Sequence, residues 1–529
     1  MSSTYIIGLD FGTESARGVL IDVVSGLQES SHAHRYRHGV ITQELPNGNL
    51  IPSSYALQDA SDYLEAAEAI LCAIGSGRSI AGIGLDFTAS SPLSARADGT
   101  ALSVVHPGEA HAYVKLWKHA ASQPYADIIN KQGGAFLVNS GGRLSGEWLL
   151  AKAAEIAAEA PALWAETDRF IEAGDWLVWQ LTGHEVRSLD FAAYKAHFER
   201  DTGYPRGVVP GLIERLGEPH VVGTPAGSLT PAWRARTGIE GDAIVAVAVI
   251  DSHVVLPAVG AVSSGSLVGA LGTSAVFLLL DDRIRPFPKG IEAVAESAAL
   301  PGLWCYEAGQ AGFGDMLAWF VRTFPRADDL GENFRLYNQE AAGLAPGQNH
   351  LVALDWWSGN RVPYSDSGLS GLLAGLNLAT TAAGIYRALL EALCYGARSI
   401  VDRLTDDGLP INHILLTSGL AHNNHLLVQI MADVLGREIK VPSILNPTAV
   451  GAAIHGAVAA GIATDFADGA HRFGAGKGIM YQPDRTCTAI YDELYDNYTM
   501  LSATKQVRSS MHALNRLEST VTRSDPVAS

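Results

Sequence analysis

The first 26 residues alternate between apolar runs and short polar turns, a pattern that predicts a β-hairpin. An apolar run from Tyr5 to Leu9 is followed by the polar stretch 10–17, and a second apolar run covers Gly18 to Ile21. Two such runs joined by a short polar segment with a glycine are typical of hairpins. The glycine at the tip, Gly12, either provides a positive φ angle or leaves room for an anion to approach the backbone.

The same pattern returns in the middle of the chain. Residues 6–22 read IIGLDFGTESARGVLID, residues 266–282 read SLVGALGTSAVFLLLDD, and Gly12-Thr13 aligns with Gly272-Thr273. This internal similarity predicts two related domains that each open with a hairpin. Two Gly-Thr tips that face each other across a cleft could hold a polyphosphate through backbone N–H groups and hydroxyls. A chance similarity between two glycine-containing hairpins is the alternative.

Residues 413–442 predict a strand, a glycine-containing turn, an amphipathic helix and a second strand. The turn, Ser418-Gly419-Leu420, would let the backbone approach a flat ligand closely. Residues 448–461 are rich in Ala and Gly and predict a helix that packs tightly. Glycine at a strand end is most often only a turn, so neither segment identifies a function alone.

Length, charge and cysteine content narrow the class of protein. A chain of 529 residues is longer than a single hydrophobic core usually supports, so at least two domains are expected. The net charge of −18 argues against a nucleic-acid partner or an acidic membrane surface, although a local site can still bind a small anion. The four cysteines form no CxxC pair, and residues 243–262 are interrupted by polar residues and a proline, so neither a disulfide framework nor a membrane span is expected. We expect a cytoplasmic protein.

The two Gly-Thr hairpins and the turn at 418–420 together resemble the actin-like ATPases, and among them the FGGY carbohydrate kinases. The stretches that carry the resemblance run from about Tyr5 to about Tyr498 and include GLDFGTESARGVLID, GIGLDFTAS, VKLWKHAA, YKAHFERDTGYP, DSHVVLPAVG, YEAGQAGFGDMLAWF and NHLLVQIMADVLGREIKV. The resemblance implies an α/β protein with two actin-like ATPase (ribonuclease H-like) domains and an active-site cleft between them. We expect residues 1–259 and 260–500 to form these domains, and residues 501–529 to form a C-terminal helix and a polar tail.

The resemblance also implies an activity. The members most similar to this chain use ATP and Mg²⁺ to phosphorylate the terminal hydroxyl of L-ribulose, giving L-ribulose 5-phosphate in arabinose catabolism. Another pentulose or pentitol, such as D-ribulose or xylulose, is an alternative substrate. An actin-like ATP-driven binding protein is an alternative from another class, but the sequence after about residue 500 predicts no peptide-binding domain. The family leads us to expect a homodimer, with a sugar and ATP as ligands.

Carried over by position, the resemblance implies a sugar site formed by Ala89, Lys195, Asp251 and Glu307. It implies phosphate loops at Gly12, Thr13, Gly272 and Thr273, a nucleotide-lining loop at Gly312 and Asp315, and an adenosine region at Gly419 and Asn423. The chain departs from the family at His119, where many members have aspartate, and at Ser418, where glycine is usual. The first departure puts in doubt a carboxylate contact to the sugar, and the second predicts a slightly narrower adenine pocket.

Two aspartates are candidates on their own chemistry. Asp251 follows the apolar run 243–250, and a carboxylate at the end of a buried strand is costly unless it is paired or used. Phosphoryl transfer needs a group that accepts the proton of the attacking hydroxyl, so Asp251 is the expected general base; the alternative is a helix N-cap. Asp10 ends the first strand beside a phosphate loop and suits Mg²⁺ held through water; the alternative is a turn-stabilising aspartate.

Other polar and aromatic residues allow two interpretations. Lys195 could donate to sugar oxygens or extend from the surface, and Glu307 could accept from sugar hydroxyls or only begin a helix. His253 is interpreted as a structural donor rather than a second base. The tryptophans Trp117, Trp356 and Trp357 are interpreted as core residues. The histidine-rich segment 32–38 is interpreted as an exposed strand rather than a metal site.

Overall fold

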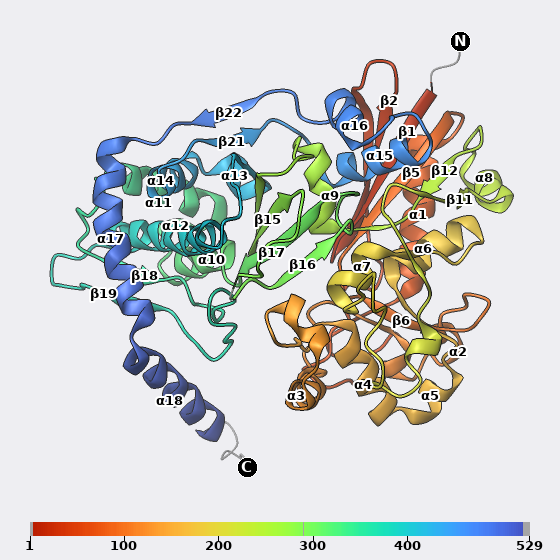
Figure 1. Ribbon diagram of the computed structural model, residues 1–529, viewed down its shortest axis with the longest axis horizontal. Helices are drawn as coiled ribbons and strands as arrows, with labels where there is room; N and C mark the ends of the chain where they lie inside the picture. Colours follow the sequence, from red (N-terminus) through yellow and green to blue (C-terminus); the bar gives the residue numbers. More distant parts are fainter. Residues whose placement is uncertain (1–3, 289, 522–529) are drawn as a thin grey trace.

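Two mixed β-sheets form the framework of the molecule (Figure 1). The computed structural model describes residues 4–288 and 290–521. The first sheet has the order β11 (Pro225–Ser228), β12 (Ile244–Ala246), β5 (Ser79–Phe87), β1 (Thr4–Phe11), β2 (Ser15–Asp22) and β3 (Gln28–Arg35), and β13 (Val249–Ile250) also pairs with β5. The second has the order β16 (Ala293–Glu296), β17 (Trp304–Gln310), β15 (Ala275–Asp281), β14 (Ser266–Leu271), β20 (His413–Thr417), β21 (Ile439–Pro442) and β22 (Gly478–Tyr481). The predicted α/β class is confirmed.

The repeat predicted from the sequence is present in the two sheets. Strand β1 pairs antiparallel with β2 and parallel with β5, and β14 pairs antiparallel with β15 and parallel with β20. A further antiparallel strand follows in each sheet, β3 beside β2 and β17 beside β15. The two Gly-Thr segments therefore occupy the same place, the tip of a hairpin, in two copies of one strand arrangement.

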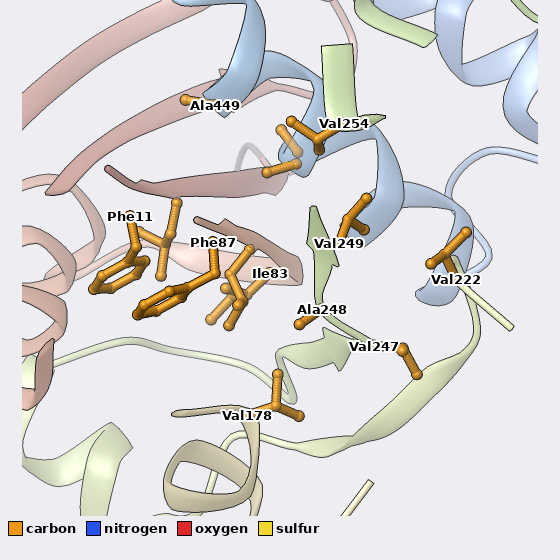
Figure 2. Packing of buried hydrophobic residues seen from close by; sticks show 14 of the residues in the cluster. Phe11, Ile83, Phe87, Val178, Val222, Val247, Ala248, Val249, Val254 and Ala449 are labelled. Atoms are coloured by element: carbon orange, nitrogen blue, oxygen red, sulfur yellow. The ribbon is translucent and has the colours of Figure 1, made fainter. Parts of the chain in front are cut away.

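Helices cover both faces of the first sheet. Helix α1 (Ala60–Gly75) packs on β2 and β3. At the ends of β1 and β5, Phe11 and Phe87 stack with ring centroids 4.9 Å apart (Figure 2). Helix α15 (Pro447–Ala459) packs on β1 and β5 from the other face. A Cβ atom on Gly8 would lie 1.7 Å from the carbonyl oxygen of Ala449, so only glycine allows this approach.

The chain crosses back to the first sheet near its end. Helices α15 and α16 (Phe466–Phe473) follow strands of the second sheet in sequence, but their apolar residues belong to the core of the first sheet. Figure 1 shows both helices, coloured blue, beside the red strands β1 and β2. The domain boundary at residue 259 stays a prediction, and residues 447–473 pack across it.

The remaining elements form a lobe beside the first sheet and a helical layer around the second. The lobe has its own apolar cluster. With the segments that connect it to the first sheet it comprises β4 (Leu57–Gln58), β6 (Pro92–Ala95), α2 (Leu102–Val105), β7 (Val114–Lys115), α3 (Gln123–Gln132), α4 (Leu149–Glu159), α5 (Pro161–Glu166), β8 (Arg169–Glu172), α6 (Ala173–Thr182), β9 (Arg187–Ser188), α7 (Leu189–Lys195) and β10 (Pro219–His220). Helices α8 (Pro231–Thr237) and α9 (Asp251–Ala258) instead add apolar residues to the core of the first sheet. The second half adds α10 (Gly314–Thr323), α11 (Leu330–Ala342), β18 (Val352–Leu354), β19 (Leu372–Ala374), α12 (Ala382–Asp406), α13 (Gly419–Asn423), α14 (His425–Leu435), α17 (Arg485–Ala503) and α18 (Lys505–Val521).

Two predicted segments differ in detail from the structure. The apolar run 243–250 is divided into β12 and β13, because the N–H group of Val247 turns away and donates to the carbonyl of Thr224 at 3.0 Å. The C-terminal helix is present as α18, and the predicted polar tail from residue 522 lies outside the described residues. Among the described helices, none combines the length and the apolar character that crossing a bilayer requires.

Candidate active site

Three carboxylates meet where neighbouring parallel strands of the first sheet end. Asp10 on β1 lies opposite Asp86 on β5, and Asp251 follows directly after β13, which pairs with the end of β5. The carboxyl ends of parallel strands share one edge of a sheet, so the strand pairing itself gathers these residues. Asp86 is fully buried, and neither of its carboxylate oxygens has a hydrogen-bond partner among the described residues. Burial, followed by the charges of Asp10 and Asp251, raises the pKa of Asp86 well above its usual range.

The environment of Asp251 suits a proton acceptor. Ile250 is the N-cap of α9 and Asp251 the first helical residue, so the N-cap interpretation of Asp251 is wrong. Its Oδ1 atom accepts from the N–H group of Ser252 at 2.7 Å. Burial, and then the charge of Asp10, raises the pKa of Asp251 to about 7. A carboxylate that titrates near neutral pH is matched to general-base chemistry.

Asp10 is tied to the segment that returns from the second half. The hydroxyl of Thr448, in the first turn of α15, donates to Oδ2 of Asp10 at 2.6 Å. The adjoining hairpin tip is held from the lobe side, because Gln58 donates to the carbonyl of Thr13 at 2.6 Å and Trp117 donates to its hydroxyl at 3.1 Å. The first phosphate-loop candidate is therefore fixed by residues far apart in sequence.

A buried chain of charges joins the lobe to the second sheet. Asp190 accepts from His253 at 2.7 Å, and Nε2 of His253 lies 3.5 Å from Oε2 of Glu307. Nζ of Lys195 lies 3.9 Å from Oε1 of the same glutamate. Lys195 is only 13% exposed, so it is not a lysine that extends from the surface. Helix α7 and strand β17, from opposite halves of the chain, thus place Lys195 and Glu307 together.

The charge states of this chain follow from its contacts. Burial lowers the pKa of His253, but Asp190 and Glu307 outweigh burial and raise it to about 9. Burial raises the pKa of Glu307, but Lys195 and His253 outweigh that effect and lower it to about 2. Glu307 is therefore ionised and able to accept hydrogen bonds, and His253 is the structural donor that the sequence predicted.

The glycines at the two hairpin tips are not required by the turns themselves. Neither Gly12 nor Gly272 has a positive φ angle. A Cβ atom would meet its nearest neighbour at 3.4 Å on Gly12 and at 3.5 Å on Gly272, which is ordinary contact. The interpretation of Gly12 as a positive-φ residue is therefore wrong. A bare backbone that the fold does not need is what close approach of a phosphate requires.

The second tip lies beside the other nucleotide candidates. The carbonyl of Thr273 accepts from Phe313 at 2.9 Å, and the carbonyl of Gly272 accepts from Gly314 at 3.0 Å, which brings Gly312 and Asp315 to the tip. Gly419 and Asn423 begin and end α13, directly after β20, the parallel neighbour of β14. Gly272, Thr273, Asp315, Gly419 and Asn423 are exposed, as a nucleotide surface would need.

The two departures from the family have clear local settings. Ser418 has φ +80° and ψ 171°, a conformation that favours glycine. His119 is fully buried, accepts from the N–H group of Ala56 at 3.3 Å and lies 3.0 Å from Oε2 of Glu155. Both ring nitrogens of His119 are thus used inside the lobe. His111, Glu155 and Glu159 lie close enough together to suggest a metal site. The Lys115 ammonium lies 2.9 Å from Oε1 of the same Glu155, and its positive charge disfavours binding of a metal cation there.

Sequence reasoning missed three residues at this site. Asp86 ends the apolar run of β5 in the same way that Asp10 ends β1, so the rule that selected Asp10 would also have found Asp86. The expectation that Trp117 is a core residue is wrong, because the side chain is exposed and its indole N–H donates to the hydroxyl of Thr13 at the first tip. Asp190 has no sequence signal, because its role depends on the approach of α9. Trp356 is buried in the core as predicted.

The chain is similar to known proteins in both sequence and fold. The model of the FGGY family of carbohydrate kinases, C-terminal domain, matches residues 267–460. The ribulokinase of Halalkalibacterium halodurans is 40% identical over 95% of this chain and 95% of that protein. The ribulokinase of Mycolicibacterium smegmatis is 38% identical over 94% of this chain and 93% of that protein.

Solved structures of the same fold cover almost the whole chain. A xylulose kinase from Rhodospirillum rubrum has a TM-score of 0.82 at 21% identity and covers 96% of this chain and 100% of its own. A kinase from Brucella ovis, described as a xyloylose kinase, has a TM-score of 0.82 at 20% identity with the same coverage. The fold is that of the two-domain, actin-like ATPases to which these sugar kinases belong.

Proposed function

Because the chain belongs to the FGGY family of carbohydrate kinases, we propose that it transfers the γ-phosphoryl group of ATP to the terminal hydroxyl of L-ribulose. The relatives named ribulokinase, at up to 40% identity over nearly the whole chain, support this choice of sugar. The observation that carries the proposal is that Asp251, whose pKa is raised to about 7, lies close enough to Lys195 for the lysine charge to act on it, and that Lys195 in turn lies beside Glu307 of the second sheet.

Asp251 is the general base of the proposed reaction. Its carboxylate accepts the proton of the terminal hydroxyl as the sugar oxygen forms a bond to the γ-phosphorus of ATP. The bond between that phosphorus and the bridging oxygen breaks, and ADP leaves. Positioning and charge stabilisation supply most of the catalysis in such transfers.

The sugar hydroxyls are held by groups of fixed charge. Ionised Glu307 accepts hydrogen bonds, and the Lys195 ammonium donates them. Ala89, in the loop that follows β5, limits the space for the sugar. The His253 cation, held by Asp190, keeps Glu307 in place and ionised.

The two hairpin tips hold the phosphates of ATP through backbone N–H groups and the hydroxyls of Thr13 and Thr273. Gly312 and Asp315 line the nucleotide, and Gly419 and Asn423 form the adenosine region. Asp10 and Asp86 suit Mg²⁺, because it prefers carboxylate oxygens and the buried Asp86 oxygens lack a hydrogen-bond partner among the described residues. When bound, the ion neutralises charge on the transferred phosphoryl group. A cytoplasmic homodimer remains a prediction.

A coupled assay of ADP formation over L-ribulose, D-ribulose, D-xylulose, L-xylulose and the pentitols tests the proposal. We expect the highest kcat/KM with L-ribulose, and turnover at least about a hundredfold lower in the Asp251→Asn variant prepared in the same way, which excludes a contaminating kinase. A preference for xylulose, the substrate in the name of the Rhodospirillum rubrum kinase, would move the assignment to another pentulose kinase. ATP hydrolysis that no sugar stimulates would refute the kinase proposal.

A further inference from the structure

A buried lysine joins the lobe to the loop that carries Ala89. Lys152 lies on α4 and is fully buried. Its Nζ atom lies 2.5 Å from the carbonyl oxygen of Ser90, 2.9 Å from that of Leu116 and 3.2 Å from that of Lys115. An ammonium group has three N–H donors, so the three carbonyls satisfy it completely.

A buried glutamate holds the next residue of the same loop. Glu172, the last residue of β8, is 3% exposed, and its Oε2 atom accepts from the N–H group of Ser91 at 2.8 Å. The carbonyl of Ser90 and the N–H group of Ser91 belong to one peptide unit, which is therefore gripped by the Lys152 side chain on one side and the Glu172 side chain on the other.

The gripped peptide unit has a conformation that the loop would not choose alone. Ser90 has φ +61°, which is uncommon for a residue with a side chain. Its hydroxyl also donates to the carbonyl of Glu147 at 2.5 Å. Burial lowers the pKa of Lys152 and raises that of Glu172, and each is partly offset by the charge of the other. Apolar residues often stabilise a core at least as well as a buried Lys–Glu pair. We therefore attribute the presence of this pair to the need to fix the conformation of the Ser90–Ser91 peptide unit.

We propose that Lys152 and Glu172 are positioning residues for the sugar. They hold the loop 88–91 so that Ala89 borders the terminal carbons of the sugar at the distance that the transfer needs. This inference rests on the proposed function and extends it to two residues that do not touch the substrate. The loop follows Phe87, the last residue of β5, and carries the sugar-site candidate Ala89. The adenosine candidates Gly419 and Asn423 lie on α13, beside the second sheet. Displacement of the loop should therefore affect the sugar more than ATP.

Steady-state kinetics of four variants tests the positioning role. Glu172→Leu and Lys152→Met remove the grip, Glu172→Gln keeps an oxygen that accepts from Ser91, and Ile156→Val loosens α4 without touching the loop. We expect Glu172→Leu and Lys152→Met to raise KM for L-ribulose about tenfold or more and to change KM for ATP less than about twofold. Glu172→Gln and Ile156→Val should stay close to wild type. Equal changes in both KM values, or the same changes in Ile156→Val, would overturn the proposal.

Hydrogen exchange provides a readout that needs no turnover. Peptides covering residues 86–93 should exchange faster in Glu172→Leu and Lys152→Met than in wild type, and Glu172→Gln should preserve the protection. If the loop exchanges faster but KM for the sugar is unchanged, the loop is not a sugar-positioning element. If the wild-type protein phosphorylates no pentulose, the proposed function fails, whereas protection that depends on Glu172 would still support the grip. Unchanged protection in both variants would refute it.

Discussion

The two hairpin units of this protein have the same construction and different strand ends. Two residues before the tip glycine, β1 has Asp10 opposite Asp86 on its parallel neighbour, whereas β14 has Ala270 opposite Thr417. Both tips present Gly-Thr. In the proposed function, the shared arrangement supplies a backbone surface for phosphate twice, whereas carboxylates occupy this strand position in the first unit alone of these two.

A second difference concerns how each unit is covered. Gly8, four residues before the first tip glycine, lets α15 lie directly on β1. The corresponding residue of β14 is Val268, which is fully buried. The first unit gives up a core side chain so that the N-terminus of α15, with Thr448, can reach Asp10. The close packing of α15 on β1 thus also positions the carboxylate of Asp10.

The largest expected effect concerns the carboxylates at the strand ends of the first sheet. Asp251→Asn keeps the shape and removes the proposed base, so kcat should fall about a hundred- to ten-thousandfold with ATP affinity little changed. The raised pKa gives the sign of the pH dependence. The ionised carboxylate is the active form, so wild-type kcat/KM for the sugar should rise with pH and level off above about 7. The variant should lack this rise; a rise of the same midpoint in the variant would assign it to another group.

The next effect breaks the second unit. Gly272→Val should weaken binding of a nonhydrolysable ATP analogue at least about tenfold, because a side chain at the tip blocks backbone approach to phosphate. Binding of the sugar should change little, since Asp251, Lys195 and Glu307 lie elsewhere. Calorimetry with each ligand separates the two effects. Unchanged affinity for the analogue would refute the phosphate-loop role, and equal losses for both ligands would indicate misfolding.

A smaller effect is expected where α15 packs against Gly8 of β1. Gly8→Ala should lower the free energy of unfolding by about 1–3 kcal/mol or more, because its Cβ would meet the backbone of α15 and force it away. Gly476→Ala is the matched control, since Gly476 has open space around its Cβ position and no positive φ. Chemical denaturation of both variants measures the difference. Equal stabilities would show that α15 does not lie on β1 as described.

The smallest expected effect concerns the adenosine region of the second unit. Ser418→Gly should raise the free energy of unfolding by about 1 kcal/mol, because glycine relieves the strained φ and ψ and loses part of that gain through its greater freedom when unfolded. Ser418→Ala keeps a Cβ and should give no gain. Thermal melts compare the two. A gain in both variants would mean that the hydroxyl, rather than the backbone, was unfavourable.

The sequence predicted correctly the features that depend on local residue patterns. Apolar alternation and the repeated Gly-Thr segment predicted both hairpins, and the ends of the apolar runs predicted the positions of Asp10 and Asp251 at strand ends. The sequence could not predict that α15 and α16 return to the first sheet, because that packing depends on glycine contacts between segments more than 400 residues apart, such as Gly8 and Ala449.

The parts of the site that escaped prediction depend on contacts rather than on pattern. The charge on His253 is set by Asp190 and Glu307. The three residues lie on three separate elements, α9, α7 and β17. The grip on the loop 88–91 needs α4 and β8 to approach from opposite sides. Such buried polar contacts leave no periodicity in the chain, so only the folded structure reveals them.

In the proposed mechanism, the carboxylates at the strand ends of the first sheet divide the work, with Asp251 as the base and Asp10 as a Mg²⁺ ligand. A magnesium titration of ADP formation for wild type, Asp10→Asn and Asp251→Asn tests it most directly, with thermal melts to confirm folding. Calorimetry of the ATP analogue at several Mg²⁺ concentrations gives the same comparison without turnover. We predict that Asp10→Asn needs at least about tenfold more Mg²⁺ for half-maximal rate and recovers part of its activity, and that Mg²⁺ does not rescue Asp251→Asn. The same magnesium response in both variants, or near wild-type turnover by Asp251→Asn, would contradict the account.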